Sequence, residues 1–276
     1  MSIQVLRLAA LLYAGAAAAY VVFFARPRHV RAATIGGALL AVAFLVHAIG
    51  IGLGCKEFGG TEFFTQRGSL VLLGWLLAGA YLVMQRLYGL PTVGAFVTPL
   101  VLVVLVPTLF GQPGQSEVDP EFIRSRWLLQ AHIAVAVLGV ALFAIAALVA
   151  VMYLLQEREV KGKHFGALFS RLPSLESLDR LNQRLVRAGF LVFTVALLAG
   201  TLVASQVWKR AWEWDPQQVR ALLVWILYGA LVQVRHLGWH GRRFALMTIA
   251  GFALLVGSWA ALGAFPGATR HGGTYQ

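Results

Sequence analysis

The chain has 276 residues, of which 59% are hydrophobic and only 12% are charged, and its formal net charge is +12. Soluble domains average roughly 45–50% apolar and about 25% charged residues, so this composition excludes an ordinary soluble domain and indicates a polytopic membrane protein. The basic residues lie in short stretches between apolar segments, which favours a role in membrane orientation over nucleic-acid binding.

Eight stretches are long and apolar enough to cross a bilayer, which takes about 20 residues. They fall at 3–25, 31–54, 69–88, 91–110, 127–155, 185–206, 218–235 and 243–264. The sequence therefore predicts an all-α polytopic integral membrane protein, with about eight transmembrane helices in one bundle and a single domain over 1–276. The first stretch contains small residues that resemble a signal-peptidase site, but its apolar run continues past them, so we expect an uncleaved first helix.

The distribution of lysine and arginine predicts the orientation of these helices. Basic residues are more frequent in the connections that follow the first, third, fifth and seventh stretches. Cytoplasmic loops carry an excess of lysine and arginine, so both termini are expected outside. The loops 111–126 and 207–217 and the tail 265–276 would then lie at the outer face.

The longest inner connection, 156–187, has a pattern of its own. Pro173 and Ser174 can start a helix. The apolar residues that follow are spaced to form one stripe: Leu175, Leu178, Leu181 and Leu185. We expect a short amphipathic helix along the inner membrane surface, which serves either as a connector or as a docking site for a cytoplasmic partner.

Several kinds of enzyme chemistry lack their signatures in this sequence. There is no phosphate-binding G-x-x-x-x-G-K-[ST] loop, and no Ser/His/Asp set or cysteine nucleophile can be recognised. The single cysteine, Cys55, excludes an internal disulfide and a cysteine-based metal cluster. We therefore expect the chain to bind or carry a ligand and not to be an enzyme on its own.

A tryptophan-rich run stands between the sixth and seventh stretches. Trp208, Trp212 and Trp214 are followed by Asp215 and Pro216. Tryptophan prefers the membrane–water interface, but an interfacial belt does not require the spacing W-x3-W-x-W-D-P. This spacing predicts an aromatic shelf, formed by the three tryptophans, with one acid beside it.

Seven histidines offer candidate ligands, and four of them stand at informative places. An ionisable residue at membrane depth is costly and is a functional hypothesis by default. The four candidates are His47 in the second stretch, His132 in the fifth, His236 at the end of the seventh and His271 in the tail. Three of them also have an ordinary explanation, since His47 and His132 could be hydrogen-bonded helix residues and His271 a solvated terminus.

A multi-histidine metal site is poorly supported by the spacing. His236 and His240 are four residues apart, but they lie in a loop-like run with no acid nearby, whereas zinc prefers three or four close ligands. Two distant histidines on either side of an aromatic shelf better suit a flat, largely apolar ring such as haem, whose iron accepts imidazoles. Its propionates could pair with basic residues on the same side: Arg124, Arg126, Lys209, Arg210 and Arg270.

The tryptophan run resembles the signature of the haem-handling cytochrome c assembly family, which includes CcsA-like and HemX-like proteins. The runs at 132–158 and 225–252 and the tail RHGGTY are also similar to segments of that family. The sequence departs from the signature at Lys209, where glycine is usual, and at Gln217-Gln218, where Lys-Glu is usual.

The resemblance implies a haem site with defined residues. Trp208, Trp212, Trp214 and Asp215 would form the outer site, and His132 and His271 would be the axial ligands of a non-covalent, b-type haem. His47 and His236 would correspond to histidines within the membrane that mark a haem route. The implied setting is a bacterial cytoplasmic (inner) membrane, with apocytochrome c and other cytochrome c maturation proteins as possible partners.

Three functions remain open at this point. The first is haem handling or delivery at the outer face during c-type cytochrome biogenesis. The second is HemX-like regulation of haem biosynthesis through the 156–187 segment. The third is a b-type electron carrier with permanent haem between His47 and His236, although these two residues are predicted toward opposite faces of the membrane.

Overall fold

The structure is a computed structural model. It describes residues 1–276 with the exception of 27, 59–64, 111–126, 164–165, 208–211, 213 and 264–276. The side chains of 167, 168, 207 and 259–263 also lie outside the description. Every regular element in the described part of the chain is helical, as the sequence predicts.

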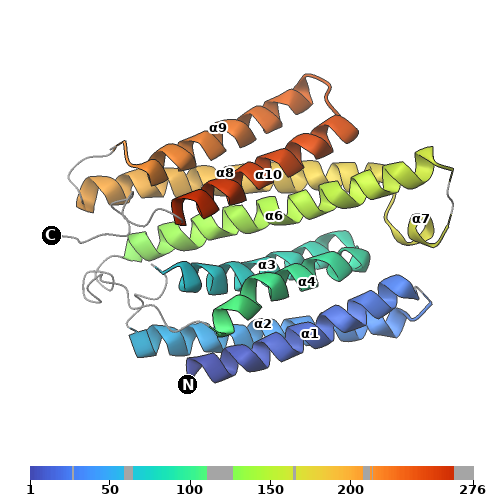
Figure 1. Cartoon of the computed structure of the whole chain (residues 1–276), viewed down its shortest axis with the longest axis horizontal. Coiled ribbons are helices and arrows are strands. Elements are labelled where there is room, and N and C mark those ends of the chain that lie inside the picture. The colour runs from blue at the N-terminus through green and yellow to red at the C-terminus, as the bar shows by residue number, and fades with distance from the viewer. Residues whose placement is uncertain are drawn as a thin grey trace. The chain divides into compact units, whose positions relative to one another are not determined.

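The helices follow the predicted apolar stretches closely (Figure 1). In chain order they are α1 (Ser2–Ala25), α2 (Val30–Phe58), α3 (Gln66–Tyr88), η2 (Pro91–Val93), α4 (Gly94–Leu105), η3 (Val106–Leu109), α6 (Trp127–Lys161), α7 (Ala167–Arg171), α8 (Leu175–Val207), α9 (Pro216–His236) and α10 (Arg242–Gly263). Among the described residues, seven helical segments are long and apolar enough to cross a membrane, with η2, α4 and η3 together forming one of them. The eighth predicted stretch, 243–264, corresponds to α10, and the polytopic all-α class is confirmed.

The chain divides into two compact units. One comprises Met1–Ser116 with Leu155–Ser174, and the other comprises Glu117–Leu154 with Leu175–Gln276. We describe each unit by itself. The expectation of one bundle over 1–276 stays a prediction.

In the first unit, small residues allow α1 and α2 to pack closely. A β-carbon added at Gly50 of α2 would lie 2.7 Å from Cδ2 of Leu6 in α1, and one added at Gly36 would lie 3.1 Å from Cδ2 of Tyr20. Small residues at a membrane-helix interface let the two backbones approach. The glycines and alanines of these apolar stretches therefore act as packing surfaces between the helices.

Buried tyrosines occupy the centre of the first unit. The rings of Tyr20 in α1 and Tyr81 in α3 meet edge to face, with 5.8 Å between their centroids. The Tyr20 hydroxyl donates to Oε1 of Gln85, and a β-carbon on Gly94 would lie 2.4 Å from the Tyr81 hydroxyl oxygen. The first turn of α4 must therefore begin with glycine to pack against both rings.

In the second unit, aromatic contacts fix α8 against α9 and α6 against α9. The Trp225 indole of α9 donates to Oγ1 of Thr194 in α8 at 2.9 Å, and its ring stacks on Phe190 with 5.7 Å between centroids. Phe143 of α6 stacks on Tyr228 of α9. These contacts bury large apolar rings and satisfy the indole N–H at the same time.

The connection at 156–187 differs from its prediction. α6 continues to Lys161, a short α7 follows, and α8 begins at Leu175 and runs to Val207 without interruption. The expected amphipathic segment is thus the first turns of a long helix and not a separate short helix. Three of the four residues of the predicted stripe, Leu178, Leu181 and Leu185, are buried, and Leu175 is partly exposed. No proline separates this segment from the apolar stretch that follows, so the same helical phase continues.

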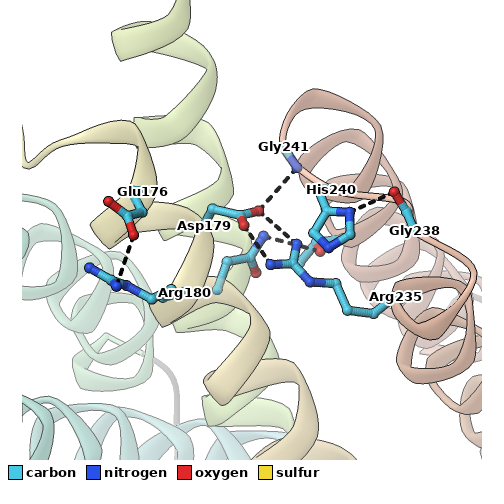
Figure 2. Close-up of polar contacts among 9 residues, drawn as sticks. Glu176, Asp179, Arg180, Arg235, Gly238, His240 and Gly241 are labelled. Atoms are coloured by element: carbon cyan, nitrogen blue, oxygen red, sulfur yellow. Dashed lines mark hydrogen bonds and ion pairs between the residues drawn. The ribbon is translucent and has the colours of Figure 1, made fainter.

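A polar cluster fastens the beginning of α8 to the turn between α9 and α10 (Figure 2). The Asp179 carboxylate accepts two hydrogen bonds from the Arg235 guanidinium, one of them 2.9 Å long, and a third from the backbone N–H of Gly241 at 3.1 Å. Gly241 has a positive φ of 63°, which glycine adopts without strain. The Arg235 guanidinium also lies 5.2 Å from the centre of the Phe244 ring.

Candidate functional site

His132 lies near the beginning of α6 and is held by the backbone of α8. Its Nδ1 is 2.8 Å from the carbonyl oxygen of Ala196. A carbonyl oxygen can only accept a hydrogen bond, so Nδ1 donates and carries the hydrogen. In the neutral imidazole this leaves Nε2 with a bare lone pair, which is the form that binds a metal ion. The neutral ring of His132 would therefore offer Nε2 to a metal ion.

A glycine on α8 makes room for the His132 ring. A β-carbon added at Gly200 would lie 2.7 Å from Cε1 of His132 and 3.2 Å from Nδ1. Real β-carbons do not approach so closely, so a larger residue would force the ring to move. Gly200 stands one helical turn after Ala196, and the two residues form the surface on which the imidazole rests.

The tryptophan run leads directly into α9. Trp212 and Trp214 meet edge to face, with ring centroids 5.9 Å apart, and Trp214 is 81% exposed. Asp215 is buried and caps the helix, since its Oδ1 accepts from the backbone N–H of Gln217 at 2.8 Å. The carboxylate that follows the tryptophans thus fixes the end of their loop to α9. Trp208 lies outside the described residues.

The register of α8 and α9 brings His132 close to the level of the tryptophan run. The helices are antiparallel, because Asp179 meets Arg235 and Thr194 meets Trp225. Gly200 is six residues beyond Thr194, so it lies at the level of about residue 219 in α9, which begins at Pro216. At a rise of 1.5 Å per residue, this is ~5 Å from the N-terminus of α9.

The second predicted axial ligand, His271, lies outside the described residues. The same holds for all five basic residues expected near the propionates: Arg124, Arg126, Lys209, Arg210 and Arg270. The pairing of His132 with His271 therefore stays a prediction.

His47 is a fully buried histidine at the centre of the first unit. Its Nδ1 is 3.2 Å from the Tyr13 hydroxyl, and the two rings meet edge to face. Among the described residues, no group forms a hydrogen bond of standard geometry with Nε2, although the backbone of Val71 is close enough to interact with the ring. A β-carbon on Gly74 would lie 3.6 Å from Cε1, so a small residue faces this edge of the ring.

His236 is the last residue of α9 and is exposed. It lies at the opposite end of that helix from Trp214 and so does not join the tryptophan run. His240 is also exposed, and its Nδ1 contacts the Gly238 carbonyl. Within the described ranges, no group of three or more His, Cys, Asp or Glu side chains could hold a metal ion.

Three groups that contact His132 or His47 could not be predicted from the sequence. The Ala196 carbonyl and Gly200 hold His132, and the Tyr13 hydroxyl meets His47. Every residue has a backbone carbonyl, so the sequence does not single out that of Ala196. Gly200 is one of 29 glycines, so its role does not stand out either. Tyr13 offers a weak signal, since it stands seven residues before Tyr20 on the same face of a helix rich in alanine.

Comparison with known proteins places these features in a family. The model of the family described as Cytochrome C assembly protein matches residues 64–256, which is well over half of the chain. The chain is 30% identical over 212 residues to a cytochrome c biogenesis protein CcsA of Parasynechococcus marenigrum (strain WH8102), covering 68% of this chain and 69% of the relative.

Two further relatives extend the match. The CcsA protein of Prochlorococcus marinus (strain MIT 9313) is 30% identical over 247 residues, covering 79% of this chain and 77% of the relative. That of Synechococcus elongatus (strain ATCC 33912 / PCC 7942 / FACHB-805) is 26% identical over 266 residues, covering 80% and 82%. The matched region includes α6, the tryptophan run and α9. This chain therefore belongs to the cytochrome C assembly protein family.

Proposed function

We propose that this membrane protein binds haem non-covalently beside the tryptophan run and presents it at the outer face of the membrane during c-type cytochrome maturation. The observation that carries the proposal is the contact between Nδ1 of His132 and the carbonyl oxygen of Ala196. The Nδ1–H is taken by the Ala196 carbonyl, so Nε2 is the nitrogen left to bind iron. The names of the relatives, cytochrome c biogenesis proteins, agree with this function.

The residues named in the proposal have complementary roles. His132 and His271 would hold the haem iron. The aromatic shelf offers apolar faces against which a porphyrin can stack, and the exposed Trp214 is suited to such a contact. Asp215 holds the end of the loop at α9.

The proposed chemistry needs partners. When bound, haem supplies the iron and the two vinyl groups to which the thiols of an apocytochrome c are joined. The protein's own residues would bind and orient the group and keep its vinyl groups accessible, and they would form no covalent bond themselves. A reduced apocytochrome c and other maturation proteins would be brought to this site.

The alternative of a permanent haem between His47 and His236 has less support. His236 is exposed at the end of α9, where water and lipid headgroups can reach its ring. His47 is buried against Tyr13. His47 stays a proposed second site for haem within the helices, and His236 stays a weaker candidate.

The test is an optical spectrum of the full chain purified in detergent, oxidised and reduced, before and after addition of haemin. The wild-type protein should give the spectrum of six-coordinate, low-spin haem. His132→Ala should lose that spectrum, and the double variant His132→Ala/His271→Ala should lose the haem that is held beside the tryptophan run. His240→Ala is the matched control, because His240 is an exposed histidine after the end of α9 that belongs to neither proposed haem site, and it should leave the spectrum unchanged.

Two results would contradict the proposal. If the wild type takes up no haem even with added haemin, the tryptophan run is an interfacial belt. If the double variant keeps the wild-type spectrum, haem is bound elsewhere in the chain.

A further inference from the structure

We propose that Gly200 and the Ala196 carbonyl are the positioning elements that hold His132 ready to ligate iron. This inference rests on the proposed function, since it concerns how the ligand is oriented. It assigns a specific task to two residues of α8 that themselves have no group able to bind haem.

Two contacts of His132 fall on one short stretch of α8. Nδ1 donates to the Ala196 carbonyl at 2.8 Å. The edge of the ring that carries both nitrogens faces Gly200, where an added β-carbon would lie 2.7 Å from Cε1, 3.2 Å from Nδ1 and 3.4 Å from Nε2. The orientation of the ring and its tautomer are therefore determined at the same place.

Helix geometry explains why a glycine is needed four residues after the acceptor. In an α-helix the Ala196 carbonyl accepts the N–H of Gly200, and a second lone pair remains on its oxygen. A side chain at position 200 would point back over the preceding turn and cover that oxygen. Because Gly200 has no side chain, the carbonyl stays open to the His132 Nδ1–H.

The hydrogen bond has a consequence for ligation. A histidine that binds a metal almost always donates its other N–H to a fixed acceptor, which sets the tautomer and increases the basicity of the ligating nitrogen. If the ring is pushed away from Ala196, Nδ1–H loses its acceptor and Nε2 loses its fixed direction. The iron should then lose this ligand even though the histidine is still present.

Gly200→Ala tests the inference in the purified full-length protein with added haemin. Alanine favours a helix over glycine by about 1 kcal/mol, so the backbone of α8 should not suffer. We expect loss of the low-spin spectrum, giving the same spectrum as His132→Ala. The thermal unfolding of the haem-free protein is measured in parallel.

A second glycine of the same helix provides a matched control. A β-carbon on Gly189 would lie 2.7 Å from Cε1 of Phe143, which is again an α6 ring but not a histidine. Gly189→Ala therefore causes an equal steric conflict between the same two helices. It should keep the low-spin spectrum. If both variants lose the spectrum to the same extent, the effect is general packing and the inference is wrong.

A measurement on the haem-free wild type tests the position of the hydrogen directly. Nitrogen-15 chemical shifts of labelled histidine, with the His132 signals assigned from a His132→Gln sample, should show hydrogen on Nδ1 and none on Nε2. Hydrogen on Nε2 would overturn the inference.

The outcomes separate this inference from the proposed function. If His132→Ala keeps the wild-type spectrum, the ligand assignment fails and the positioning argument fails with it. If His132→Ala alters the spectrum and Gly200→Ala does not, only the positioning of His132 is wrong.

Discussion

Asp215 joins the tryptophan run to a membrane helix through a single side chain. It is buried, it accepts a hydrogen bond from the Gln217 N–H, and Pro216 follows at the first helical position. Proline is well suited to that position because its fixed φ matches the helix and its missing N–H would have had no partner there. Trp214, Asp215 and Pro216 thus place an exposed aromatic ring directly before the N-terminus of α9.

Replacing Asp215 should weaken this start. Asp215→Ala should lower the free energy of unfolding by about 1 kcal/mol, because the capping oxygen is lost. Asp215→Asn keeps an oxygen at the same place and should cost less. Thermal unfolding of both variants in the same detergent checks the order, and an equal loss in the two variants would show that the negative charge matters more than the cap.

The contact between Tyr13 and His47 leads to a second prediction at the scale of single residues. Tyr13→Phe removes only a hydroxyl, but it leaves Nδ1 of a fully buried histidine without its partner. An unpaired buried polar atom costs about 1–3 kcal/mol, so the variant should unfold at a lower temperature.

Tyr228→Phe is the control for this variant. Tyr228 is equally buried, and within the described part of the chain its hydroxyl has no hydrogen-bond partner. Loss of that hydroxyl should therefore be neutral or stabilising. If the two variants behave alike, the Tyr13–His47 contact contributes nothing.

At the scale of helices, the cluster around Asp179 holds three elements together. The Asp179 carboxylate accepts hydrogen bonds from Arg235 near the end of α9 and from Gly241 in the turn before α10 (Figure 2). Arg235 is only 8% exposed, so its charge has little access to water when the carboxylate is removed.

Asp179→Ala should therefore destabilise the second unit by roughly 1.5–3 kcal/mol, the range for losing hydrogen bonds to charged groups. Glu176→Ala is a matched control from the same turn of α8, since Glu176 pairs with Arg180 and both side chains are mostly exposed. Exposed pairs contribute little because water screens them, so this control should unfold like the wild type. Thermal unfolding and limited proteolysis of the α9–α10 turn are measured for both variants. A larger effect of Glu176→Ala than of Asp179→Ala would contradict the assignment.

At the scale of the whole molecule, the orientation in the membrane is the main prediction. The excess of basic residues at one end of the helices predicts that both termini lie outside and that the turn after α6 lies inside. Alkaline phosphatase, which folds only outside the cytoplasm, should be active when fused after residue 276 and inactive when fused after residue 162. The reverse pattern would place the tryptophan run on the cytoplasmic side and would contradict delivery at the outer face.

The helices themselves could be predicted from sequence because bilayer thickness sets their length. Apolar runs of about 20 residues have to be helical in lipid, where every backbone polar group needs an internal partner. The prediction differs from the structure at 175–185. The pattern there, a polar stretch with an apolar stripe, fits both a separate surface helix and the extension of a spanning helix. The structure shows an extension, since nothing interrupts the helical phase between Leu175 and Val207.

By itself the sequence determined the class of protein, the approximate limits of its membrane helices, the tryptophan run and the set of candidate histidines. Hydropathy and side-chain chemistry are properties of the residues, so they can be read without a fold. Only the tertiary structure decided which groups meet those histidines. His132 depends on a carbonyl and a missing side chain 64 and 68 residues away, and His47 depends on a hydroxyl 34 residues before it. Such contacts arise from the register between packed helices, and local sequence pattern does not specify that register.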